Sequence, residues 1–147
     1  MLEKEIRNKV NIIDSIENWE NAIKFAAKPL LLDDSITENY VRTMVDNLKK
    51  FGAYILINDV IALAHARPED GVKKNCLSLL KINDGVIFDE NTNEKVYLIF
   101  VLGAEDNESH MNMLSKLMEV IDNEDIIKRM IEATSISTLI EIIKEII

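Results

Sequence analysis

The sequence predicts an α/β protein: a single domain, residues 1–147, in which a mixed sheet of about five strands is flanked by helices on both faces. Two observations lead to this fold class. Apolar residues recur at helical spacing towards both ends of the chain, whereas the middle contains short β-rich runs separated by Asn, Asp and Gly. The chain has 147 residues, 48% of them hydrophobic, which is sufficient for one substantial core.

A first long helix is expected after Ser15, which is a candidate N-cap. Apolar residues follow at helical spacing from Ile16 to Ala27. Pro29 is expected to end or kink this helix, because proline lacks the N–H group that a helix interior requires.

A second helix is expected after the stretch "SITE", in which Ser35 and Glu38 have the spacing of a capping box. The apolar positions that follow, from Tyr40 to Leu48, keep the helical period. Gly52 is the expected C-terminal cap, since glycine readily adopts the backbone conformation that ends a helix.

The middle of the chain contains the β-rich runs, and each is expected to form one strand. Residues typical of turns separate them, so the runs are distinct, although their order in the sheet does not follow from the sequence. The runs are "AYILI" from Ala53, "VIAL" from Val60, "CLSLL" from Cys76, "VIF" from Val86 and "VYLIFVL" from Val96.

Three further helices are expected in the last third of the chain, in "HMNMLSKLMEVI", "EDIIKRMIEA" and "STLIEIIKEII". Each follows residues whose side chains cap helix N-termini well. The expected caps are Asn107 or Ser109 for the first helix, Asp122 or Asn123 for the second, and Ser135 for the third.

Composition argues against several classes of protein. The longest apolar runs are far shorter than the roughly 20 residues of a membrane-spanning helix, and the N-terminus has no signal-peptide pattern. We therefore expect a cytoplasmic protein without direct membrane insertion. The net charge of −9 opposes a nucleic-acid partner, which requires clustered cations. Basic pairs, such as the one in "LKK", are expected to be solvated surface.

No metal, nucleotide or other cofactor is expected. Zinc needs three or four protein ligands, and the soft candidates are two histidines and Cys76. The phosphate-cradling patterns "GxxxxGK" and "GxGxxG" are absent from the sequence. Cys76 is the single cysteine, so it has no disulfide partner within the chain, and its neighbours favour a small buried apolar residue.

The stretch "VIALAHARPEDGV" contains the strongest candidate for chemistry. Its apolar run ends at His65, which lies between Ala64 and Ala66, so the imidazole is approachable. A neutral imidazole is a nucleophile when a hydrogen bond holds the proton on one ring nitrogen and leaves a lone pair on the other. Phosphorus and carbonyl carbon are its natural targets. The alternative is a structural histidine, which is the commoner case.

Two further residues could support this chemistry. Arg67 would lie on the same side as His65 if the strand continued, and a guanidinium suits phosphate oxygens, although Pro68 interrupts the strand pattern. His110 is expected in the first turn of a helix, where the positive end of the helix disfavours imidazolium and free N–H groups attract a phosphoryl group. Most histidines at helix starts are simply exposed.

Residues 51–72, "FGAYILINDVIALAHARPEDGV", resemble the active-site signature of enzyme IIA domains of the mannitol-fructose class. These domains are components of the bacterial phosphoenolpyruvate-dependent sugar phosphotransferase system. Three other segments resemble helices of the family, so that the resemblance covers nearly the whole chain. They are "WENAIKFAAKPLL", "ITENYVRTMVDNLKKFG" and "ESHMNMLSKLMEVI". The phrase "GxYI" followed by "HARPEDGV" is most similar to the ascorbate-type branch.

The resemblance implies roles for three residues. His65 falls on the histidine that accepts the phosphoryl group, His110 on the second active-site histidine, and Arg67 on the basic position of the signature. One position departs from the pattern, because the signature usually has proline where this chain has Ala64. Alanine restrains the backbone before His65 less than proline does.

The resemblance also implies a function, that of a phosphotransferase. His65 would take a phosphoryl group from the histidine-containing phosphocarrier protein and pass it to a IIB component, which serves the membrane IIC component, for ascorbate or a related sugar. The alternative is a regulatory module of the same family that binds a protein target according to the phosphorylation state of His65. A third reading is a degenerate domain that binds without being phosphorylated.

Overall fold

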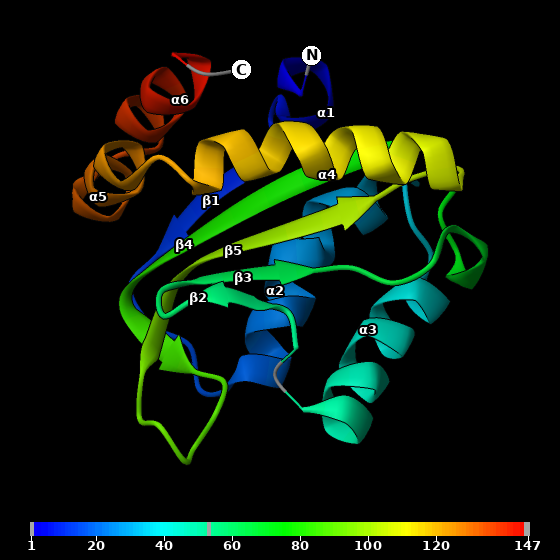
Figure 1. Ribbon diagram of the computed structural model, residues 1–147, viewed down its shortest axis with the longest axis horizontal. Coiled ribbons are helices and arrows are strands. Elements are labelled where there is room, and N and C mark those ends of the chain that lie inside the picture. The colour runs from blue at the N-terminus through cyan, green and yellow to red at the C-terminus, as the bar shows by residue number, and fades with distance from the viewer. Residues whose placement is uncertain (1, 53, 146–147) are drawn as a thin grey trace.

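The computed structural model describes residues 2–52 and 54–145. A five-stranded mixed sheet lies at its centre, with helices on both faces (Figure 1). The predicted fold class is therefore confirmed. The strands are β1 (Val10–Ile13), β2 (Leu56–Asn58), β3 (Ile61–Ala64), β4 (Cys76–Ile87) and β5 (Lys95–Gly103).

The order of the strands, β1-β4-β5-β3-β2, brings distant parts of the chain together. β4 pairs antiparallel with β5, and β2 with β3, whereas β1 runs parallel to β4 and β3 runs parallel to β5. Because β3 and β5 are parallel neighbours, their carboxyl ends lie at the same edge of the sheet. Ala64, the last residue of β3, is opposite Val101 of β5. His65 follows directly, close to where β5 leads into the next helix.

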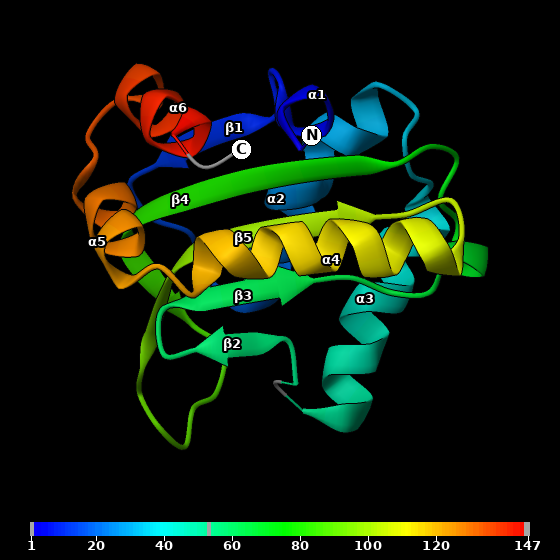
Figure 2. The same cartoon turned by 45° about the horizontal axis from the view of Figure 1, so that its top comes forward.

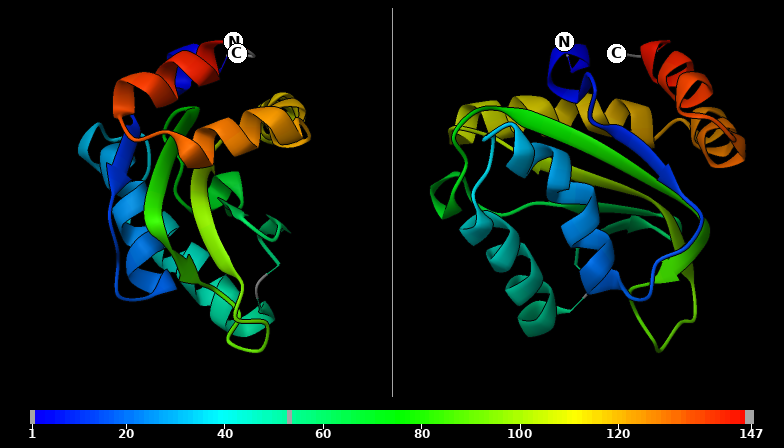
Figure 3. Two further views of the ribbon diagram at one scale, coloured as in Figure 1. Left: turned by 90° about the vertical axis from the view of Figure 1, so that its left-hand side faces the viewer. Right: turned by 180° about the vertical axis from the view of Figure 1, so that it is seen from behind.

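Helices cover the two faces of the sheet, and a hydrophobic core lies under each layer. The layer with α2 and α3 lies behind the sheet in Figure 2 and in front of it in the right view of Figure 3. The other layer consists of α1, α4, α5 and α6. The helices are α1 (Glu3–Ile6), α2 (Trp19–Leu32), α3 (Glu38–Phe51), α4 (Asn107–Ile121), α5 (Glu124–Glu132) and α6 (Ile136–Lys144), with a 3₁₀ turn at Pro68–Asp70.

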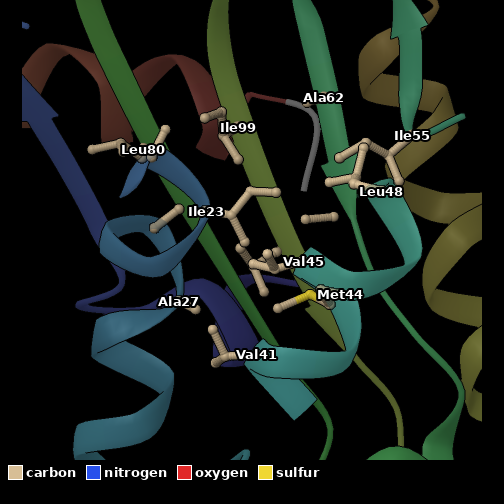
Figure 4. Close-up of a cluster of buried hydrophobic side chains, with 14 of the residues drawn as sticks. Ile23, Ala27, Val41, Met44, Val45, Leu48, Ile55, Ala62, Leu80 and Ile99 are labelled. Carbon is tan, nitrogen blue, oxygen red and sulfur yellow. The ribbon is translucent and has the colours of Figure 1, made fainter. Parts of the chain in front are cut away.

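Alternation along the strands supplies both cores. In β3, Ile61 and Leu63 are buried in one core, and Ala62 and Ala64 in the other. This is the pattern expected of a strand covered on both faces. Figure 4 shows the core under α2 and α3, where side chains of both helices meet those of the three central strands. The labelled residues are Ile23, Ala27, Val41, Met44, Val45, Leu48, Ile55, Ala62, Leu80 and Ile99.

Cys76 lies in the same core and is 2% exposed, as expected of a small apolar residue. Burial raises the pKa of its thiol to about 12, so the thiolate is disfavoured. Within residues 2–52 and 54–145, no helix combines the length and the apolar character needed to span a membrane.

The strand count is five, although the five differ from those predicted. The runs "CLSLL" and "VIF" belong to one strand, β4, whose pairing with β5 is irregular between Lys81 and Val86. Gly85, with a φ of 72°, lies in this irregular part. The fifth strand is β1, which the sequence analysis did not predict. β1 has four residues and pairs with β4 at the edge of the sheet, so its apolar run is too short to be recognised as a strand in the sequence. The predicted run "AYILI" begins at Ala53, which lies outside the described part of the chain. The strand that corresponds to this run, β2, begins at Leu56.

The predicted start of the first long helix is wrong. Asn18, not Ser15, caps α2, and its side chain accepts a hydrogen bond from the N–H of Asn21 at 2.8 Å. Pro29 does not end the helix, which continues to Leu32. Proline removes the one backbone hydrogen bond that an N–H at this position would donate, and burial of the next residue, Leu30, in the core offsets that loss.

The predicted capping box at Ser35 and Glu38 is also wrong. Thr37 caps α3, with its hydroxyl oxygen accepting from the N–H of Tyr40 at 3.3 Å. Ser35 is 1% exposed and donates its hydroxyl to Asp33 at 2.6 Å. The Ser35 side chain therefore binds the residue that follows α2 and does not cap the start of α3. The other end is as predicted: Gly52 follows α3 with a φ of 81°.

The caps of the last two helices are confirmed. Asn123 caps α5, and its side chain accepts from the N–H of Ile126, while Ser135 caps α6 by accepting from the N–H of Thr138. The predicted run of α6 extends beyond Glu145 into residues 146–147, which lie outside the described part of the chain.

A buried hydroxyl group joins three elements at the edge where β3 and β5 end. The Tyr40 hydroxyl of α3 accepts from the N–H of Ala66 at 2.9 Å and donates to the carbonyl of Leu102 in β5 at 2.6 Å. Tyr40 is fully buried, and burial raises the pKa of its phenol far above the usual range, so the proton that it donates is retained. The residue after His65 is thus attached both to a helix and to the sheet.

Replacing Tyr40 with Phe should lower the free energy of unfolding by about 1–3 kcal/mol, because the Ala66 N–H and the Leu102 carbonyl lose a buried partner. Urea denaturation followed by circular dichroism measures the change. Tyr97→Phe is the matched control, since that side chain of β5 is partly exposed, and its effect should stay within about 0.5 kcal/mol. Equal effects of the two substitutions would contradict the role given to the Tyr40 hydroxyl.

Candidate functional site

His65 follows the last residue of β3, and its ring has a defined proton position. The Nδ1 atom lies 2.9 Å from the carbonyl oxygen of Leu63. Because a carbonyl only accepts hydrogen bonds, the proton of the neutral ring is on Nδ1, and Nε2 has the free lone pair. The flanking Ala64 and Ala66 are buried, while His65 itself is partly exposed. Nε2 is therefore the nucleophilic atom of the ring.

Ala64 stands where the signature usually has proline, and the strand itself restrains its backbone. It is 1% exposed and opposite Val101 in the parallel pairing of β3 with β5. The chain immediately after His65 is restrained as well, by the Tyr40 hydroxyl at Ala66. Restraints on both sides thus hold the histidine at the end of the strand.

The structure brings His110 next to His65, as the sequence analysis expected. Their ring centroids are 5.6 Å apart, with 49° between the ring planes. His110 is the fourth residue of α4, whose N-cap is Asp106 and not Asn107 or Ser109. The Asp106 side chain accepts from the N–H of Ser109 at 2.7 Å. This N–H of the helix start is therefore occupied by the cap, which leaves fewer free donors there than expected.

His110 favours the neutral form. Burial lowers the pKa of its imidazole, and the nearby His65 lowers it further. Its Nδ1 is buried and has no hydrogen-bond partner among the described residues. An unpaired buried donor is rarer in proteins than an unpaired acceptor, so Nδ1 is best occupied by a lone pair. The proton then lies on Nε2, where it is a hydrogen-bond donor.

Arg67 lies beyond the end of β3, so its position does not follow from strand alternation. Its backbone N–H donates to the carboxylate of Asp70 at 2.9 Å, and its Nε is 3.6 Å from the same oxygen. The side chain is 78% exposed, and Pro68 begins the short 3₁₀ turn that carries Asp70. The guanidinium group thus has one anionic partner and keeps several donors facing solvent.

A second link attaches this turn to α3. Both the backbone N–H and the hydroxyl of Thr37 donate to the carbonyl of Gly71, at 3.0 and 3.1 Å. Gly71 has a φ of 133°, and a Cβ atom at this position would collide with the Thr37 hydroxyl. Glycine therefore lets the turn after His65 approach the start of α3 closely.

The histidines and Arg67 line one cleft of about 590 Å³. Two of its lining residues, Lys50 and Arg67, are cations, and none is a carboxylate, although the chain has a net charge of −9. Such a cleft favours an anion. The lining residues are Asn47, Lys50, Phe51, Tyr54, His65, Ala66, Arg67, Pro68, Asn107 and His110.

Sequence reasoning missed several of these residues. The pair Lys49 and Lys50 was expected to be ordinary solvated surface, yet Lys50 lines the cleft. Tyr54 lies within the "GxYI" phrase, and its ring meets that of His65 edge to face, with centroids 6.2 Å apart. The signal for Lys50 was its place at the end of a helix that precedes the histidine strand. No local pattern shows which side of that helix faces the cleft.

Among the described residues, no group of three or more His, Cys, Asp and Glu side chains is arranged to hold a metal ion. The site is thus built from two imidazoles, two cations and neutral polar groups. This set suits nucleophilic attack on phosphorus, with donors for the oxygens of the transferred group.

Comparison with known proteins agrees with this chemistry. Residues 5–146 match the model of the family described as "Phosphoenolpyruvate-dependent sugar phosphotransferase system, EIIA 2". The chain is 33% identical over 136 residues to the mannitol-specific cryptic phosphotransferase enzyme IIA component of Escherichia coli, with 92% of both chains covered. A solution structure bearing that protein's name superposes with a TM-score of 0.92 at 32% identity and covers 98% of both chains.

Two further matches concern related proteins of Escherichia coli. The ascorbate-specific EIIA component is 27% identical over 74% of this chain and 71% of its own length. A complex of the mannitol enzyme IIA with phosphorylated enzyme IIB superposes with a TM-score of 0.80 at 25% identity, covering 95% of this chain and 96% of the other. The family match spans nearly all of the sequence, and the chain therefore belongs to the EIIA 2 family of the phosphoenolpyruvate-dependent sugar phosphotransferase system.

Proposed function

We propose that this phosphotransferase component carries its phosphoryl group on Nε2 of His65. The group arrives from the histidine-containing phosphocarrier protein and leaves to a IIB component. The observation that carries the proposal is the hydrogen bond of 2.9 Å between His65 Nδ1 and the Leu63 carbonyl. It leaves the nucleophilic lone pair on Nε2, in a cleft lined by cations and without carboxylates.

In the proposed reaction, the Nε2 lone pair attacks phosphorus while the bond from phosphorus to the donor nitrogen breaks. The three oxygens travel with phosphorus, and the electron pair of the broken bond returns to the donor. The His65 ring retains its Nδ1 proton, so the phosphorylated ring is cationic, and the Leu63 carbonyl stabilises that charge. A cationic ring is also a good leaving group, which favours onward transfer. The protein contributes mainly position and electrostatic stabilisation.

His110 supports this transfer as a neutral donor. Its ring lies beside that of His65, and its Nε2 proton is available to an oxygen of the phosphoryl group. A neutral donor stabilises the charged transition state without forming a strong ion pair, which would hold the group too tightly for reversible transfer. Arg67 contributes positive charge from the rim of the cleft, tempered by Asp70.

The partners follow from the same chemistry. A IIB acceptor is supported by the complex in which a related enzyme IIA is bound to phosphorylated enzyme IIB. The membrane IIC component is then served indirectly, through IIB. We propose that the sugar is ascorbate or a related sugar. Because the relatives include a mannitol-specific and an ascorbate-specific component, the IIB components to compare as acceptors are those of the ascorbate and mannitol types. Phosphoryl transfer from this protein to ascorbate-type and mannitol-type IIB components, measured side by side, decides between them.

His65→Ala should abolish phosphorylation when the protein is incubated with phosphoenolpyruvate, enzyme I and the phosphocarrier, because the acceptor atom is removed. Radiolabelling and intact mass measure the product. His110→Gln is the matched control: it should still be labelled at His65 but transfer onward to IIB more slowly, since one donor to the phosphoryl group is lost. Labelling of the His65→Ala protein would disprove the assignment. Labelled protein that no IIB component accepts would favour the regulatory role instead.

His110 should titrate below its ordinary pKa of 6.5, because burial and the neighbouring His65 both disfavour imidazolium. The folded protein then binds this proton more weakly than the unfolded chain. The free energy of unfolding should therefore fall as the pH drops below 6.5, and His110→Gln should weaken this dependence. NMR titration of the ring protons gives the pKa directly. In His65→Gln the pKa of His110 should rise yet stay below 6.5, since burial remains; a value above 6.5 in the wild type would contradict the neutral form.

A further inference from the structure

The C-terminal end of α3 carries two adjacent lysines with different surroundings. The Nζ atom of Lys49 lies 3.4 Å from a carboxylate oxygen of Glu20 in α2, away from the histidines. Lys50 lines the cleft of His65 and His110. Within residues 2–52 and 54–145, no carboxylate lies within ion-pair distance of Lys50, so its charge is not locally neutralised. The two lysines form a natural pair for comparison, one bound to a helix and one facing the cleft.

An aromatic contact holds the Lys50 side chain. Its Nζ lies 5.2 Å from the ring centroid of Phe51, in the range of a cation–π interaction. Phe51 is 64% exposed and lines the cleft, so its ring is accessible to the lysine side chain. A lysine side chain has four rotatable carbon–carbon bonds and is normally mobile, so this contact restricts the ammonium to the side of the cleft where the ring lies.

The Phe51 ring is itself connected to the histidines by a series of ring contacts. Phe51 meets Tyr54 edge to face with centroids 6.5 Å apart, and Tyr54 meets His65 in the same manner at 6.2 Å. His65 then meets His110 at 5.6 Å. Four rings thus form a continuous row along the cleft, with the ammonium of Lys50 at one end. The side chain of Lys50 is long and exposed, so the ammonium can extend from the Phe51 ring along this row towards a phosphoryl group on His65.

The charges in the cleft give Lys50 a role that Arg67 does not fill. A phosphoryl group on His65 adds negative charge where the cleft contains two cations. The guanidinium of Arg67 has Asp70 beside it, with Nε 3.6 Å from the carboxylate, which offsets part of its charge. Lys50 is therefore the cation whose full charge is available to the transferred group.

Building on the proposed function, we propose that Lys50 is a catalytic residue for phosphoryl transfer, whose ammonium binds an oxygen of the phosphoryl group as it arrives at and leaves His65. Phe51 is a positioning residue, since it acts through Lys50. The ammonium keeps its three protons throughout, so the transfer remains an exchange of one phosphorus–nitrogen bond for another. Because the ammonium contacts the phosphoryl group during both its arrival and its departure, Lys50 lowers the activation free energy of transfer in both directions.

The test compares Lys50→Gln with Lys49→Gln, using two phosphoryl donors. One donor is the phosphorylated phosphocarrier protein, and the other is phosphoramidate, a small molecule that makes no protein interface. Lys50→Gln should slow labelling of His65 at least about tenfold with both donors, because a charged ligand of the phosphoryl oxygens is lost. Lys49→Gln should stay within about twofold of the wild type, and Phe51→Leu should lie between the two. Lys50→Arg should recover part of the rate.

A second measurement separates this role from a structural one. The ³¹P NMR signal of phosphorylated His65 reports the pKa of its phosphoryl group, which a nearby cation lowers. This pKa should be higher in Lys50→Gln than in the wild type and unchanged in Lys49→Gln, while thermal unfolding of both variants matches the wild type.

Three results would overturn the proposal for Lys50. These are equal labelling rates of Lys50→Gln and the wild type, an unshifted ³¹P titration, or a defect confined to the protein donor, which would assign Lys50 to partner docking. If the wild-type protein is not labelled at His65 by either donor, the proposed function fails instead. Labelling of the wild-type protein therefore distinguishes failure of the proposed function from failure of the proposal for Lys50.

Discussion

The arrangement of the site depends on one buried hydroxyl group. Tyr40 binds the N–H of Ala66 and the carbonyl of Leu102 at the edge of the sheet where β3 and β5 end. The first contact fixes the backbone beside His65, and the second fixes the end of the strand that leads to α4 and His110. Because Tyr40 belongs to α3, the same residue also sets the position of the helix whose far end carries Lys50. Helix, loop and strand are thus held in one geometry.

Sequence reasoning predicted the parts of the molecule that local patterns encode. The fold class and most of the helices are as expected because hydrophobic periodicity carries that information, and the closeness of His65 to His110 is as the family resemblance implied. Several features were mistaken or missed because local patterns do not decide between competing partners. Edge strand β1 exists only by pairing with β4, and Ser35 is used by Asp33 instead of by α3. Lys50, in the last turn of α3, and Tyr54, just after that helix, line the cleft because of the way in which this segment packs against the sheet.

Charge is distributed unevenly over the protein. The chain has a net charge of −9, yet the cleft around the histidines contains cations and no carboxylate. The cations that line the cleft favour anionic groups there, although the protein as a whole is acidic. The surroundings of the two histidines differ as well: the Leu63 carbonyl accepts the Nδ1 proton of His65, whereas burial lowers the pKa of His110. In the proposed reaction, this difference makes His65 the carrier and His110 a hydrogen-bond donor.

The parallel pairing of β3 with β5 has a consequence for biosynthesis. His65 and His110 belong to segments that are distant in the sequence and are adjacent only when both strands have joined the sheet. A ribosome-bound chain that ends before β5 has His65 without its neighbour and without the Leu102 contact of Tyr40. Such an incomplete chain lacks the paired histidines of the cleft. Pairing of β3 with β5 is therefore a condition for assembling the cleft that contains both histidines.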